Sequence, residues 1–200
     1  MITEAAAAEV PTDLAQVPEP PALARSPFRL LVAQYARKDT SVELRGGWAG
    51  RWKLLRAALR FARGRGNLPA IQEQFREVPF ETLEQPFGPL PAGVDEIFTR
   101  YLRVKVQGLH FCGRAYYDIP LVEGFQSLAL IVPATLYLAR WLAASEGRTQ
   151  LTVEDVSRAL ATADHHHGYS PIFGQGSFRR RVRMLAQMDA ISKLCAWYAR

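Results

Sequence analysis

Apolar residues recur every three to four positions along several stretches of the chain, which is the period of an amphipathic helix. Four stretches show this period clearly, and they are 51–63, 94–109, 152–168 and 178–200. A short alternation at 102–107 would suit a strand, but the longer window around it follows the helical period. The stretch 28–35 is too short for its pattern to distinguish a strand from a helix. The pattern therefore predicts an all-α protein.

The most apolar segment, 121–144, predicts a central helix that is buried on nearly all sides. Its uninterrupted apolar run, 127–139, is shorter than the roughly 20 residues that a membrane span needs. Pro133 lies inside the run and should kink the helix, because its nitrogen carries no hydrogen to donate. We therefore expect a compact multi-helix bundle with a kinked apolar central helix. Its predicted core includes Leu128, Ile131, Leu138, Leu160, Leu185 and Ile191.

The predicted helix 51–63 carries two distinct faces. Its apolar side is formed by Trp52, Leu55, Leu59 and Ala62, and its basic side by Lys53, Arg56, Arg60 and Arg63. We favour an apolar side packed on the core and a solvated basic side, because Lys and Arg prefer exposed helix faces. The alternative is a helix that lies on an anionic or membrane surface.

Composition and charge place limits on the domain organisation and the compartment. The segment 1–26 is rich in Ala, Pro and Glu and predicts a flexible, disordered acidic leader, followed by a single helical domain, 27–200. The two cysteines, Cys112 and Cys195, form no CxxC pair, and the leader resembles no signal peptide. A reducing, cytoplasmic location is the simplest interpretation. The net charge of +6 can attract anions, but no nucleic-acid-binding motif accompanies it, so no nucleic acid is expected.

The stretch ADHHHGYSP, 163–171, is the densest group of reactive side chains. Its candidate functional cluster comprises Asp164, His165, His166, His167 and Tyr169. A capping box in TVED starts the helix at Thr152, and Gly168 should end it in a left-handed conformation. Successive helical residues point about 100° apart, so three adjacent histidines cannot face one metal. We therefore favour a structural helix end over a metal or catalytic site.

No cofactor is predicted, although zinc or iron is the metal that such a group could hold. The candidate ligands would be His110, Cys112, His165 and His167. A second candidate site is a set of anion-binding arginines at the start of the last predicted helix, Arg179, Arg180, Arg181 and Arg183. Cations there oppose the helix dipole, so we expect carboxylates such as Glu154 and Asp155 to pair with them.

The second half of the chain resembles a known family. RYLRVKVQGLHFCG, VEGFQSLALIVPATLYLARWLA and LTVEDVSRALATADHHHGYSP, with the closing WYAR, are similar to the C-terminal helical region of YkgJ-type cysteine-cluster proteins. That family includes the flagellin lysine-N-methylase relatives, and the resemblance covers 95–200. The family's N-terminal cysteine cluster is not present in this sequence. The resemblance therefore implies the helical half alone, either as a truncated gene product or as a domain whose protein partner supplies the cluster.

The resemblance and the pattern together predict a helical accessory or interaction domain. No catalytic residue follows from the resemblance, and whether the chain is an enzyme is left open. One alternative is a metal-dependent enzyme that uses 165–169. Another is a membrane-associated helical protein with 121–144 inserted, but the shortness of the apolar run leads us to expect no membrane contact.

Overall fold

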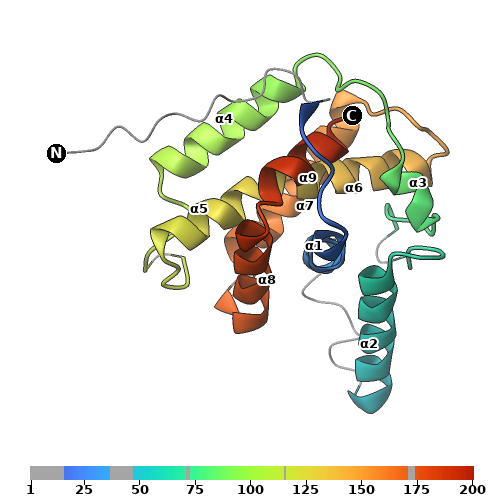
Figure 1. Ribbon diagram of the computed structural model, residues 1–200, viewed down its shortest axis with the longest axis horizontal. Coiled ribbons are helices and arrows are strands. Elements are labelled where there is room, and N and C mark those ends of the chain that lie inside the picture. The colour runs from blue at the N-terminus through green and yellow to red at the C-terminus, as the bar shows by residue number, and fades with distance from the viewer. Residues whose placement is uncertain (1–15, 37–46, 71–72, 115, 171–173) are drawn as a thin grey trace.

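The computed structural model describes residues 16–36, 47–70, 73–114, 116–170 and 174–200, and within these ranges the chain is helical without a strand (Figure 1). The helices are α1 (Ala22–Tyr35), α2 (Gly47–Arg63), α3 (Phe80–Glu84), α4 (Val94–Gln107), α5 (Leu121–Ala129), α6 (Ile131–Ser145), α7 (Val153–Tyr169), α8 (Gly176–Gln187) and α9 (Ile191–Tyr198). The prediction of an all-α bundle is confirmed.

Helix α1 resolves the ambiguity of the stretch 28–35, which is helical. The helix begins at Ala22, inside the segment that was assigned to the leader. Ala24 and Phe28 are fully buried, so this part of the predicted leader belongs to the core. The pattern missed it because only one short turn of apolar residues precedes Pro27. The prediction for residues 1–15 lies outside the described residues.

The central apolar segment is bent, as Pro133 predicts. Helix α5 ends at Ala129, and α6 begins at Ile131 after a turn at Leu130, so that the axis bends by 25°. The residue four positions before Pro133 is Ala129, whose carbonyl oxygen receives no hydrogen bond from the proline nitrogen. The segment 121–145 is long and apolar enough to cross a membrane by length and composition alone, but 83% of its apolar window is buried inside the structure.

Helix α6 lies at the centre of the core and contacts α1, α3, α7 and α9. An aromatic cluster joins three of these helices: the Phe28 ring stacks on Tyr198 at 5.2 Å, and Tyr137 meets Tyr198 edge-on at 5.3 Å. Five of the predicted core residues are buried, namely Leu128, Ile131, Leu138, Leu160 and Leu185. The sixth, Ile191, is only partly buried because it lies in the first turn of α9.

A buried arginine on α6 and a partly buried glutamate on α3 join the segments that meet around α6. The fully buried Arg140 donates hydrogen bonds to the carbonyl oxygens of Leu83, Gln85, Trp197 and Arg200. Burial lowers the pKa of Arg140 to about 10, so the guanidinium stays charged at neutral pH. Glu84 accepts hydrogen bonds from Arg29, Trp197 and Tyr198.

The last predicted helix is two helices, α8 and α9. Asp189 between them adopts a left-handed conformation, with φ of 49°. The Asp189 N–H binds the Ala186 carbonyl, and the Ala190 N–H binds the Leu185 carbonyl, which is the Schellman pattern that closes a helix. The sequence pattern continued across this break because Asp, and not Gly, occupies the left-handed position.

Helix α2 forms as predicted, but its apolar side does not pack on the core. Trp52, Leu55 and Leu59 are exposed by 56%, 48% and 44%. The buried side of the helix is marked instead by Gly50 and Phe61. The expectation of a core-packed apolar side is therefore wrong, because an amphipathic period identifies an apolar side without showing that a neighbour covers it.

Candidate functional site at the end of helix α7

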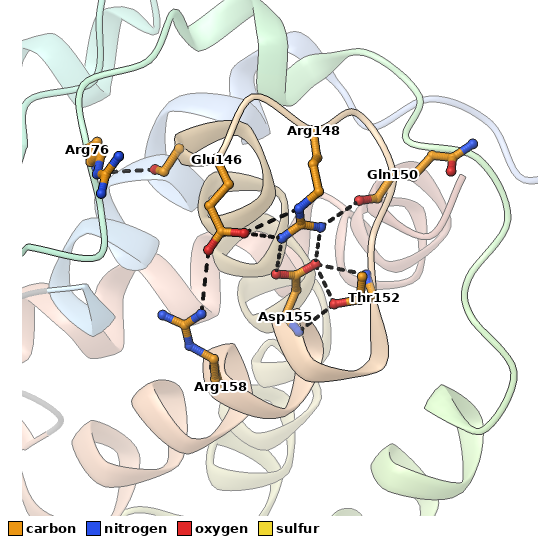
Figure 2. A network of polar contacts seen from close by, with 8 residues as sticks. Arg76, Glu146, Arg148, Gln150, Thr152, Asp155 and Arg158 are labelled. Carbon is orange, nitrogen blue, oxygen red and sulfur yellow. Dashed lines mark hydrogen bonds and ion pairs between the residues drawn. The ribbon is translucent and has the colours of Figure 1, made fainter.

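The start of α7 is fixed by the predicted capping box. The Thr152 hydroxyl accepts a hydrogen bond from the Asp155 N–H, and the Asp155 carboxylate accepts one from the Thr152 N–H. Arg148 donates two hydrogen bonds to the same carboxylate and reaches Glu146 as well (Figure 2). Although burial opposes its ionisation, these bonds lower the pKa of Asp155. This network fixes where α7 begins and thus which way its last turn faces.

The three histidines of α7 point in different directions, as the helical geometry requires. His165 is exposed, whereas His166 and His167 are buried. The helix continues through Gly168 and ends at Tyr169, with Ser170 as its C-cap. The prediction that Gly168 ends the helix is therefore wrong. One reason is that Tyr116, from another segment, caps the carbonyl of His167.

Asp164 joins α7 to α4 through two polar contacts. Its Oδ1 accepts a hydrogen bond from the Tyr101 hydroxyl at 2.9 Å and forms an ion pair with the Lys105 ammonium at 2.6 Å. Burial, followed by the nearby carboxylate, raises the pKa of Tyr101 well above its ordinary value. Tyr101 therefore remains a neutral hydrogen-bond donor, and Asp164 is neutralised by Lys105.

His167 is the most buried member of the predicted cluster. Burial, and then the charge of Lys105, lower the pKa of His167 to about 3, whereas Asp164 opposes this shift. An efficient general base has a pKa near the working pH. A neutral imidazole of such low basicity accepts protons poorly, so the site is not suited to acid–base catalysis by His167.

The candidate metal ligands are not brought together by the fold. Among the residues that the structure describes, no group of three or more His, Cys, Asp or Glu side chains could hold a metal ion. His110 is exposed on the loop after α4, and Cys112 is a partly buried free thiol beside Gly124. The side chain of Tyr169 lies outside the described residues.

One of the four arginines at the start of α8, Arg179, pairs within the chain, but with another partner than expected. Arg179 forms a two-point ion pair with Glu123 of α5, at 2.6 and 3.1 Å. Asp155 is instead bound by Arg148. Arg180 and Arg183 are exposed, and Arg181 is partly buried, which lowers its pKa. These arginines do not gather into one anion site, because the helix spreads them over different sides.

An apolar surface that the sequence assigned to the core lies exposed on α5. Leu121, Val122 and Phe125 are exposed by 60%, 67% and 55% and form the surface that we call the α5 face. They follow one another at one- and three-residue intervals, so they cover one side of the helix. The opposite side of α5 is buried at Glu123 and Ser127.

The loop before α5 contains unusual backbone conformations. Leu109, Tyr117 and Asp118 adopt positive φ angles of 51°, 53° and 52°. Such conformations are costly for residues with bulky side chains and gather at functional segments. Leu109 is also 58% exposed, so the strain is not compensated by burial of its side chain.

The two regions differ in their chemistry. At the end of α7, Asp164 is paired with Tyr101 and Lys105 and His167 is weakly basic, whereas the α5 face offers uncovered apolar surface. The sequence could have revealed the exposed α5 face only through the adjacent Leu121 and Val122, which break the helical period. In comparisons with protein-family models, curated proteins and solved structures, no match to this chain is found.

Proposed function

We propose that the chain is a helical interaction domain that binds a protein partner through the α5 face. The observation that carries this proposal is the exposure of Leu121, Val122 and Phe125, each by more than half, on one side of a helix. Contiguous exposed apolar surface is typical of protein–protein interaction sites.

Two contacts hold the α5 face outward. A Cβ added to Gly124 would lie 2.0 Å from the Phe111 carbonyl oxygen, so only glycine permits this close approach of α5 to the preceding loop. On the same helix, Glu123 is anchored by Arg179 of α8. Because the inner side is fixed in this way, the apolar residues opposite cannot turn into the core without breaking both contacts.

The resemblance to the C-terminal half of YkgJ-type proteins supports a specific partner, one that carries the cysteine cluster. In that arrangement the present chain acts as an accessory domain of a lysine-N-methylase-like assembly. The two cysteines are both free thiols, which supports a cytoplasmic location, where thiols stay reduced.

Site-specific photo-crosslinking in the native cell tests the proposal. A photoreactive phenylalanine analogue at position 125 should capture one protein, whereas the same analogue at the exposed Glu154 should not. The captured protein, once purified, should bind the chain, and Phe125→Asp should weaken this binding at least tenfold, or by about 1.4 kcal/mol. The proposal would be refuted if both positions captured the same protein, or if position 125 captured none. A captured partner without a cysteine cluster would refute only the family assignment.

A further inference from the structure

Helix α2 carries a second exposed apolar surface, which is a straight line along the helix. Trp48, Trp52, Leu55 and Leu59 are exposed by 80%, 56%, 48% and 44%. Their spacing of four, three and four residues places them above one another on a single side. We call this line the tryptophan stripe.

Basic residues flank the tryptophan stripe on both sides. Helical geometry places Arg51 along one edge and Arg56 and Arg63 along the other, and all three are exposed. No Asp or Glu occurs anywhere in 47–70. In the described part of the chain, none of these three arginines forms an ion pair, so no described carboxylate neutralises their charge.

The helix is held by one end and projects from the body at the other (Figure 1). Arg29 donates hydrogen bonds to the carbonyl oxygens of Phe61 and Ala62 in the last turn, where helical carbonyls need partners. The Phe61 ring packs edge-on against Phe80 at 5.6 Å. Trp48 lies at the opposite, projecting end of the helix.

The buried side of α2 lies opposite the stripe. Gly50 and Phe61 face the protein, about half a helical turn away from Trp48 and Leu59. A flat surface can therefore contact the whole stripe while the rest of the molecule stays on the other side. Neither α2 nor the core has to rearrange for this contact.

We propose that α2 binds the surface of anionic lipid membranes through the tryptophan stripe. Trp and Leu on one side, with Lys and Arg beside them and no acidic residue, is the composition of helices that lie in a membrane interface. Tryptophan prefers this depth because its ring is apolar and its N–H is polar. The flanking arginines meet the anionic headgroups.

Other ligands of cationic helices fit these residues less well. Single-stranded nucleic acid is bound by aromatic rings that alternate with cations along the strand, whereas these two tryptophans share one line with leucines. An apolar groove of a protein would bury the tryptophan stripe, but it would leave the arginines on both edges of the stripe without an anionic partner. The expectation of no membrane contact rested on the short central apolar run and on a core-packed apolar side of α2, and the exposed stripe removes the second of these reasons.

Binding to vesicles of phosphatidylcholine, with and without phosphatidylglycerol, tests this inference. The wild-type chain should co-sediment with the anionic vesicles and only weakly with neutral ones. The triple variant Arg51→Gln, Arg56→Gln, Arg63→Gln should bind about a hundredfold less tightly, since each basic residue near an anionic surface contributes about fivefold. The matched triple variant Arg103→Gln, Arg180→Gln, Arg183→Gln, with the same net charge, should stay within about threefold.

Tryptophan fluorescence reports the contact directly. Of the four tryptophans, Trp141 and Trp197 are buried, so a blue shift on vesicle addition would come from Trp48 and Trp52. The double variant Trp48→Ser, Trp52→Ser should show no blue shift and should bind anionic vesicles at least tenfold less tightly. Its far-ultraviolet circular dichroism spectrum should be unchanged. The variant Leu121→Ser, Phe125→Ser, which alters the α5 face, should bind vesicles normally.

Four results would overturn the inference. The first is no binding to anionic vesicles, and the second is an equal loss of binding in the two triple variants. The third is competition by free inorganic phosphate at millimolar concentration, which would indicate a simple anion site, and the fourth is preference for a single-stranded oligonucleotide over vesicles. None of these outcomes bears on the α5 face.

Discussion

The ring of Tyr116 lies on the imidazole of His167, with ring centroids 5.1 Å apart, and the same tyrosine donates a hydrogen bond to the His167 carbonyl oxygen at 2.8 Å. One side chain thus covers the histidine and caps the end of its helix. The imidazole is removed from water by this contact, which is why burial dominates its pKa.

We expect the free energy of unfolding to decrease as the pH falls from about 6.5 to about 3. The folded pKa of His167 is lowered to about 3, so between these values only the unfolded chain binds this proton. The histidine alone contributes a slope of up to about 1.4 kcal/mol per pH unit, and above about pH 7 its contribution is constant. Urea titrations at a series of pH values measure the slope.

Replacement of His167 separates this effect from the protonation of carboxylates. His167→Phe keeps an aromatic ring against Tyr116 and should flatten the pH dependence between about 3 and 6.5. His165→Phe, at the exposed neighbouring position, should leave it unchanged. If the free energy of unfolding has the same pH dependence in the wild type and in His167→Phe, the imidazole is in contact with water in the folded protein.

Leu109 stores strain at the end of α4 that glycine would release. The Leu109 N–H binds the Val106 carbonyl and the His110 N–H binds the Lys105 carbonyl, so Leu109 occupies the left-handed position of a Schellman motif. Leu109→Gly should stabilise the protein by about 1 kcal/mol relative to Leu109→Ala, because both remove the side chain but only glycine removes the Cβ. Thermal unfolding of the two variants gives the difference, and an equal or greater stability of the alanine variant would contradict it.

Arg140 should be intolerant of replacement even by another cation. Arg140→Met takes a donor away from four carbonyl oxygens, of which that of Arg200 keeps its bond from the Phe87 N–H, and should cost at least about 3 kcal/mol. Arg140→Lys should recover only a small part, because an ammonium cannot reproduce the planar fork that serves several acceptors. Arg158→Met serves as the control. It removes a half-exposed ion pair between Arg158 and Glu146, whose atoms lie 3.7 Å apart, and should change the free energy of unfolding by less than about 0.5 kcal/mol. A small loss of stability in Arg140→Lys, measured by denaturant titration, would show that a positive charge without the planar fork is enough to hold these carbonyl oxygens.

The centre of the core and its margin should respond differently to truncation. Ile131→Ala removes a fully buried side chain and should cost about 2–5 kcal/mol. Ile191→Ala, at a partly buried position, should cost clearly less. The two midpoints of urea unfolding test this order, and a reversed order would be inconsistent with α6 at the centre.

The sequence predicted the elements whose signals are local. The helical period located α4 and α7, the capping box at Thr152 located the first residue of α7, and Pro133 located the bend before α6. Each of these features depends on residues within one or two turns of one another. No distant part of the chain is needed to interpret them.

The features that the sequence did not predict depend on tertiary neighbours. The line of Trp52, Leu55 and Leu59 has the same period as a buried side, and only the absence of a covering helix in the described fold makes it a surface. The break at Asp189 and the strain at Leu109 involve residues other than glycine in left-handed conformations. Glu84, which binds three side chains, lies in α3, a five-residue helix that is too short to show a helical period in the sequence.

The stacking of Phe28 on Tyr198 has a consequence for synthesis on the ribosome. The two rings come from α1 and α9, so nearly the whole described chain must be translated before Phe28 meets Tyr198. At about 5–20 residues per second, this takes roughly ten to thirty seconds, although α2 and α6 reach α1 earlier. The side of the core that α9 covers is therefore the last to close during synthesis.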